Sequence, residues 1–140
     1  MNIPAKKLRE DAKLPEYEHE GDAGMDVFSV EAVVLEPGAR HAISTGIAIA
    51  VPDGYVGLVW DKSGRALKEG LSTMAGVIDS GYRGEVQIVV LNTSTEPIQI
   101  EAHQKVAQIL IQSVLSGMVT EVVELDDTTR GEGGFGSTGL

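Results

Sequence analysis

The sequence predicts an all-β protein, a jelly-roll-like barrel or sandwich with one short helix and a mobile C-terminal arm. Seventeen glycines are spread through the 140 residues as turn signals instead of being gathered in a linker. Short runs rich in β-branched residues lie between these turns, a spacing typical of antiparallel sandwiches and barrels. Aromatic residues make up only 4% of the chain, so we expect an aliphatic core.

The predicted strands follow one another along the chain. A strand is expected in each β-branched run, over residues 27–35, 42–51, 55–60, 85–91, 97–101 and 118–125. Two of the separating turns are Glu36-Pro37-Gly38 and Pro52-Asp53-Gly54, since proline and glycine favour turns. Residues 105–115 have apolar positions at both the helical and the strand period, and their β-branched content favours a strand.

Only residues 63–70 predict a helix. Ser63 is placed to cap the first turn, because a serine hydroxyl accepts a hydrogen bond from a free backbone amide there. Gly70 is placed to end the helix, since glycine readily adopts the left-handed conformation of a C-terminus. Lys62 and Gly64 flank the serine, and a lysine, a hydroxyl and a helix start together suit an anion. An ordinary capped helix with solvated charges is the alternative.

The last fifteen residues differ in composition from the rest of the chain. Phe135 and Leu140 are their large apolar side chains, too few to bury a core. We therefore expect one β domain over residues 1–125 and a mobile arm over residues 126–140. The arm carries groups that suit a lid over a phosphorylated ring compound: Arg130, Phe135, Gly136, Ser137 and Thr138. An inert disordered terminus is the alternative.

Charge and composition argue against several classes of function. Acidic residues outnumber basic ones 21 to 11, a formal net charge of −10, which speaks against a broad nucleic-acid footprint or an anionic-membrane binder. Cysteine is absent, which excludes disulfides, thiolate metal sites and cysteine nucleophiles. No stretch approaches the ~18 apolar residues of a membrane span, and the first residues lack the apolar core of a signal peptide. We expect a soluble cytoplasmic protein.

A second candidate site lies in residues 76–85, GVIDSGYRGE. A hydrophobic strand is expected to end at Asp79, followed by a turn and another strand. At such a hairpin tip Asp79 could activate a water molecule or hold a metal ion, but an Asx turn is an equally good interpretation. Tyr82 could line a pocket or pack across the strands. Two further polar residues, Asp26 and Gln108, suit a turn and a sheet position when taken alone.

Taken in order, five segments resemble the motifs of the trimeric dUTPase family. They are Ala23-Gly24-Met25-Asp26-Val27, Asp61-Lys62-Ser63-Gly64, residues 76–85, Lys105-Val106-Ala107-Gln108 and residues 130–139. The third and fifth are highly specific, and together the five span nearly the whole chain. The resemblance implies a jelly-roll homotrimer whose three active sites are shared between subunits, each arm closing over a neighbour's site. It also implies hydrolysis of dUTP to dUMP and pyrophosphate, with Mg²⁺ bound to the triphosphate.

The resemblance assigns roles to matching positions. Asp79 matches the acid that deprotonates the water attacking the α-phosphorus, and Tyr82 matches the residue beneath the deoxyribose. Asp26 matches an acid that acts on the metal through water. The backbone that reads uracil in the family corresponds to the hairpin at Ala75, Gly76, Val77 and Ile78. Further substrate contacts, to the phosphates or through the uracil-stacking ring of Phe135, are implied for Lys62, Ser63, Gly64, Gln108, Arg130, Phe135, Gly136, Ser137 and Thr138.

Two residues of the sequence argue against two alternative functions. In the related dCTP deaminase family a catalytic glutamate stands where this chain has Val89, and valine cannot shuttle protons. A catalytically idle nucleotide-binding trimer would have no need of Asp79. One departure from the dUTPase pattern is Lys62, which stands where the second motif usually has arginine. Lysine keeps the charge but loses the bidentate fork.

Overall fold

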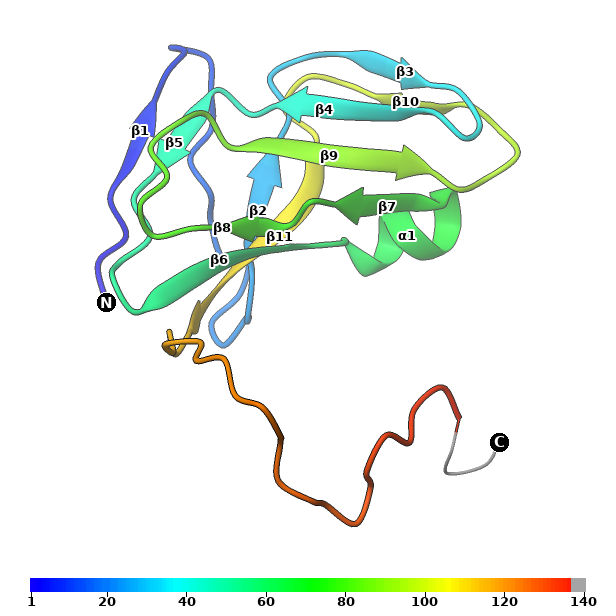
Figure 1. Ribbon diagram of the computed structural model, residues 1–140. Coiled ribbons are helices and arrows are strands. Elements are labelled where there is room, and N and C mark those ends of the chain that lie inside the picture. The colour runs from blue at the N-terminus through cyan, green and yellow to red at the C-terminus, as the bar shows by residue number, and fades with distance from the viewer. Residues whose placement is uncertain (137–140) are drawn as a thin grey trace.

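The structure, a computed structural model, describes residues 1–136 and consists of antiparallel sheets with one short helix (Figure 1). The four-stranded sheet contains, in order, β2 (Met25–Phe28), β11 (Lys105–Ser113), β6 (Tyr55–Trp60) and β8 (Val77–Ile78). The three-stranded sheet contains β4 (Arg40–Ser44), β9 (Gln87–Asn92) and β7 (Leu71–Met74). The two-stranded sheets are β1 (Ala5–Lys7) with β5 (Ile47–Ile49), and β3 (Val33–Leu35) with β10 (Ile98–Ile100). The predicted all-β sandwich is confirmed.

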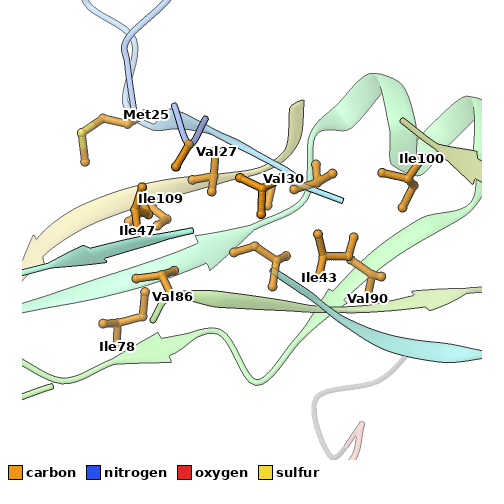
Figure 2. Close-up of a cluster of buried hydrophobic side chains, with 14 of the residues drawn as sticks. Met25, Val27, Val30, Ile43, Ile47, Ile78, Val86, Val90, Ile100 and Ile109 are labelled. Carbon is orange, nitrogen blue, oxygen red and sulfur yellow. The ribbon is translucent and has the colours of Figure 1, made fainter. Parts of the chain in front are cut away.

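An aliphatic core lies between the two larger sheets. Figure 2 shows Val27 and Ile109 of the four-stranded sheet facing the same cluster as Ile43 and Val90 of the three-stranded sheet. All four side chains are almost completely buried. Burial of one such aliphatic side chain stabilises the fold by about 1.5–3 kcal/mol. The core therefore has the aliphatic character that the low aromatic content predicts.

The strand β11 is paired on both sides. Gln108 at its middle lies opposite Asp26 of β2 and opposite Trp60 of β6. A register shift against β2 near the start of the strand allows two successive residues, Val106 and Ala107, to be buried together. Such a bulge adds one residue to the strand and interrupts its strict alternation. It accounts for the mixed period of this segment in the sequence.

Two long predicted strands each divide in two. Within residues 27–35, β2 and β3 are separated by a turn in which the Ser29 hydroxyl donates to the Glu31 carbonyl at 2.6 Å. Within residues 42–51, β4 and β5 are separated at Gly46, which has a φ of +66°. This left-handed conformation is open to glycine at low cost, and it ends the strand. The β-branched runs thus continue through turns that the sequence pattern alone does not reveal.

The strand predicted over residues 118–125 is wrong. Residues 114–136 form no regular secondary structure, and Figure 1 shows this segment leading away from the sheets. The side chains of Met118, Val119 and Val123 are almost fully exposed. A strand needs a partner for its backbone amides and carbonyls, and within the described residues this segment has none. The predicted boundary between domain and arm at residue 125 stays a prediction.

The helix α1 (Ser63–Glu69) has its N-cap one residue earlier in the chain than predicted. Its N-cap is Lys62, in an extended conformation and without a side-chain cap hydrogen bond, so the predicted capping by Ser63 is wrong. Ser63 is instead the first helical residue, and its side chain is exposed. Gly70 ends the helix as predicted, with a φ of +75° and its amide donating to the Ala66 carbonyl. Within residues 1–136 no helix has the length and apolar character needed to cross a membrane.

Truncating a core residue should destabilise the fold strongly. Ile43→Ala removes a side chain with no exposed surface, and such a truncation costs about 2–5 kcal/mol in transfer and cavity terms. Val34→Ala, on an exposed position of β3, should change stability by no more than about 0.5 kcal/mol. Urea denaturation followed by circular dichroism measures both. Equal losses would contradict the placement of the core.

Candidate active site

A pocket of about 260 Å³ lies beside the turn that follows β8. Its lining comes from the segment around β8, the turn and the start of β9: Ala75, Val77, Ile78, Asp79, Tyr82, Glu85, Val86, Gln87 and Val89. The pocket therefore brings together the predicted catalytic acid, the predicted sugar-contacting tyrosine and three of the four positions predicted to read the base.

The backbone beside this pocket is fixed by a close approach of two strands. Gly76 lies so near β6 that a Cβ there would stand 2.6 Å from the Val59 carbonyl oxygen. The Gly76 carbonyl accepts a hydrogen bond from the Val59 amide at 2.7 Å. Ala75, the preceding residue, has a φ of +51°, which is uncommon for a residue with a side chain. The hairpin backbone is thereby held in one conformation, as recognition by main-chain groups requires.

The turn positions Asp79 and Tyr82 relative to each other. The Tyr82 amide donates to the Asp79 carbonyl at 3.0 Å, and the Tyr82 hydroxyl donates to the Glu85 carbonyl at 2.9 Å. Gly84 leaves room for the tyrosine ring, since a Cβ at this position would collide with it. The Glu85 carboxylate accepts from the Gly46 amide at 2.8 Å and so ties the hairpin to the turn between β4 and β5. Asp79 is exposed, and its carboxylate is free to contact water.

A second cluster surrounds Asp26, which is only 2% exposed. The Lys62 ammonium donates to its Oδ1, and the Lys105 Nζ lies 2.8 Å from its Oδ2 as an ion pair without hydrogen-bond alignment. Lys105 also pairs with Glu18. Burial acts to raise the pKa of Asp26, but the two ammonium groups outweigh burial and hold that pKa below its ordinary value. The two carboxylates raise the pKa of Lys105.

The loop before α1 is anchored from two sides. The Gln108 side-chain amide donates to the Asp61 carbonyl at 2.9 Å. The Asp61 carboxylate accepts from both the amide and the hydroxyl of Thr73, each at 2.6 Å. Gly24 gives Gln108 its room, because a Cβ there would stand 2.6 Å from the glutamine Oε1. The loop that leads into Ser63 is therefore fixed by contacts from β7 and β11.

The two clusters lie near opposite ends of β6 in one chain. Ile78 pairs with Gly57 of β6, so Asp79 lies beside the start of that strand, whereas Lys62 follows its end. The six residue steps from 56 to 62 span up to about 20 Å at 3.3 Å per step. The structure thus joins Asp26, Lys62 and Gln108 in one group and Asp79 with Tyr82 in another.

The arm stands apart from both groups. Arg130 donates from its Nε to the Gly133 carbonyl at 2.9 Å within a local turn. The Phe135 side chain is fully exposed and its backbone has a φ of +48°. No arm residue up to Gly136 lines the pocket beside Asp79. Two predicted phosphate contacts, Ser137 and Thr138, lie outside the described residues.

A dUTPase family profile matches residues 10–139. Deoxyuridine 5'-triphosphate nucleotidohydrolase of Alkaliphilus metalliredigens is 48% identical over 142 residues, covering 100% of this chain and 99% of the relative. The chain belongs to the dUTPase family. The enzyme of the same name from Corynebacterium diphtheriae is 48% identical to this chain over 141 residues, covering 99% of this chain and 93% of that relative.

Solved dUTPase structures share the fold over almost the whole chain. A dUTPase mutant of Staphylococcus bacteriophage 80alpha with dUpNHpp superposes with a TM-score of 0.92 at 33% identity, covering 99% of both chains. A dUTPase mutant from phage phi11 of S. aureus, described with a structural Mg(II) ion, superposes with a TM-score of 0.85 at 31% identity. That match covers 91% of this chain and 100% of the phage chain.

Sequence reasoning assigned no role to several residues that shape this dUTPase-family site. Asp61 and Lys105 stand within the second and fourth motifs, respectively, but their partners are distant in the chain, so local sequence carries no signal of the contacts. Glu85 closes the third motif, and its anchoring role depends on a turn near Gly46. Lys105 lies near Asp26 because β2 and β11 pair in antiparallel register. Predicting that register from the sequence would have revealed the contact.

Replacing Asp26 should change how stability depends on pH. Because its pKa is lower in the folded than in the unfolded chain, the ionised carboxylate stabilises the fold above the unfolded value of about 3.9. This contribution is lost as pH falls through the folded value. The unfolding free energy of the unmodified protein should therefore fall more steeply below about pH 5 than that of Asp26→Asn.

Urea denaturation at a series of pH values measures this difference. Asp53→Asn, at an exposed turn position, serves as the matched control and should follow the unmodified protein. Parallel curves for Asp26→Asn and the unmodified protein would contradict the stabilising role of the buried carboxylate.

Proposed function

We propose that the protein hydrolyses dUTP to dUMP and pyrophosphate at sites shared between the chains of a homotrimer. The observation that carries the proposal is the pocket beside Asp79, which combines an exposed carboxylate, a fixed tyrosine ring and an immobilised hairpin backbone. Membership of the dUTPase family supports it. So does the fact that the phage 80alpha dUTPase mutant was solved with dUpNHpp.

In the proposed reaction Asp79 orients and deprotonates a water molecule. The water oxygen forms a bond to the α-phosphorus, and the bond from that phosphorus to the bridging oxygen of the β-phosphate breaks. Pyrophosphate leaves, and the proton goes to the Asp79 carboxylate. The carboxylate suits this role because it is exposed beside the pocket and the turn holds its backbone.

Selectivity for deoxyuridine follows from the two rigid elements of the pocket. Hydrogen bonding to the Glu85 carbonyl holds the Tyr82 ring under the sugar, where it leaves no room for a 2′-hydroxyl. The backbone at Ala75 to Ile78 offers a fixed set of donors and acceptors. A cytosine ring would present the opposite pattern of donors and acceptors and leave those backbone groups unpaired. Such a mismatch reduces the favourable binding free energy far more than the loss of one methyl contact does.

The phosphates are proposed to meet a neighbouring chain. Lys62, Ser63 and Gln108 are assigned to the phosphates, yet they lie near the end of β6 opposite to Asp79. A trimer that places the hairpin of one chain beside the α1 loop of the next would complete the site. The arm of a chain would then supply Arg130 to the γ-phosphate and Phe135 to the uracil face, excluding bulk water as it closes.

The donor set suits a magnesium ion carried by the substrate. Within residues 1–136 no cluster of three or more Asp, Glu or His side chains could hold a metal ion. Mg²⁺ commonly binds through substrate phosphates, retained waters and one or two carboxylates, and it would neutralise phosphate charge here. Asp26 would act on it through water, since both carboxylate oxygens already contact lysines.

The position of Val89 favours hydrolysis over deamination. Val89 lies in the pocket lining, where the related deaminases carry a glutamate. An apolar side chain at that point cannot transfer protons to or from a base. The pocket therefore has no glutamate at the position where deamination of dCTP requires one.

Turnover of four nucleotides tests the proposed function. Pyrophosphate release is measured with Mg²⁺ and dUTP, dCTP, dTTP or UTP side by side. We expect rapid turnover of dUTP alone. Ammonia released from dCTP would instead indicate a deaminase, and no release from any of the four would indicate an idle nucleotide-binding trimer.

Asp79→Asn should separate binding from chemistry. The amide keeps the shape of the side chain but cannot accept the proton, so kcat should fall by about a thousandfold or more, while dUTP binding changes little. Asp53→Asn is the control and should keep full activity. Undiminished hydrolysis by Asp79→Asn would remove Asp79 from the proposed role.

A further inference from the structure

Two lysines from different elements share the buried carboxylate of Asp26. Lys62 reaches Oδ1 from the loop before α1, and Lys105 reaches Oδ2 from β11. Lys105 has a second partner, Glu18, so the cluster contains two acidic and two basic groups. One ammonium group would be sufficient to neutralise Asp26.

The two lysines differ in how firmly they are held. Lys105 belongs to a strand that is paired along its length and has carboxylates on two sides. Lys62 has a single carboxylate partner among the described residues, Asp26. Moving the Lys62 ammonium away therefore breaks one ion pair, whereas moving that of Lys105 breaks two.

A lysine cannot serve Asp26 and a phosphate equally well. Its ammonium is a compact point charge, whereas an arginine at this position could direct separate N–H groups to two anions. If Lys62 turned to a phosphate while it was the only counter-ion of Asp26, a buried carboxylate would be left unpaired. Such a charge is strongly unfavourable in a protein interior.

We propose that Lys105 is a positioning residue for dUTP binding: it keeps Asp26 paired and thereby frees Lys62 to turn from Asp26 to the triphosphate. This inference rests on the proposed function, in which Lys62 contacts the phosphates. Lys105 acts through Asp26 and Lys62 and does not itself touch the substrate. It gives the fourth motif a task beyond the amide contact of Gln108.

A double-mutant cycle between Lys105 and Asp26 tests the proposal. Affinity for a non-hydrolysable α,β-imido analogue of dUTP with Mg²⁺ is measured by calorimetry on the full-length protein. Lys105→Met should weaken binding about tenfold, which corresponds to about 1.4 kcal/mol. Lys105→Arg retains the charge and should stay within about threefold of the unmodified protein.

The Asp26→Asn background separates this role from a merely structural one. Without the buried charge at position 26, no second counter-ion is needed when Lys62 turns away. In this background Lys105→Met should therefore change affinity by less than about twofold. The same tenfold loss in both backgrounds, or no loss from Lys105→Met alone, would overturn the proposal. An unmodified protein that neither binds nor hydrolyses dUTP would instead overturn the proposed function, before any variant is compared.

A surface variant keeps the test decisive if Lys105→Met does not fold. Glu18→Gln removes the outer partner of Lys105, so Lys105 pairs with Asp26 alone and Lys62 is released more readily. Binding should tighten about two- to threefold relative to Glu20→Gln, a neighbouring exposed acid that matches it in charge. Equal affinities of the two variants would count against the role of Lys105.

Discussion

The pairing of β11 with both of its neighbours is the constraint on which the rest of the site depends. Gln108 lies opposite Asp26 on one side and Trp60 on the other, so three segments far apart in sequence meet at one point of the sheet. From there the glutamine amide holds the Asp61 carbonyl, and the loop into α1 takes its course. A shift of β11 by one residue would turn these side chains to the opposite face, because successive residues of a strand point in opposite directions.

Electrostatics explain why a chain with a net charge of −10 can serve a polyanionic substrate. Several of its cations are held at defined points by acids, as Lys62 and Lys105 are by Asp26. In the proposed site Lys62 turns from Asp26 to the triphosphate, while Lys105 keeps the buried carboxylate paired. In the proposed site the backbone groups at Ala75 to Ile78 would give the base a rigid frame without any charge, so affinity and selectivity would come from different parts of the fold.

The sequence predicted those parts of the fold whose information is local. The strand over residues 55–60 was confirmed because its β-branched residues follow a clear turn and precede the predicted helix, and Gly70 ended that helix as expected. The strand predicted over residues 118–125 was wrong because the apolar side chains of this segment have no core to pack against within the described chain. The pairing of Asp26 with Lys62 joins positions 36 residues apart, and only the strand register brings them together. The roles of Ser63, Arg130, Ser137 and Thr138 stay predictions.

Division of the active site between chains is the central claim, and complementation tests it most directly. One chain carries Asp79→Asn and the other carries Lys62→Met with Ser63→Ala, and each should be inactive alone. Mixed trimers, co-expressed and purified through two different tags, should recover about a third of the sites, because each mixed trimer joins one intact hairpin to one intact loop of a neighbour. A complete absence of dUTP hydrolysis in verified mixed trimers would contradict a shared site and place hairpin and loop in the same chain.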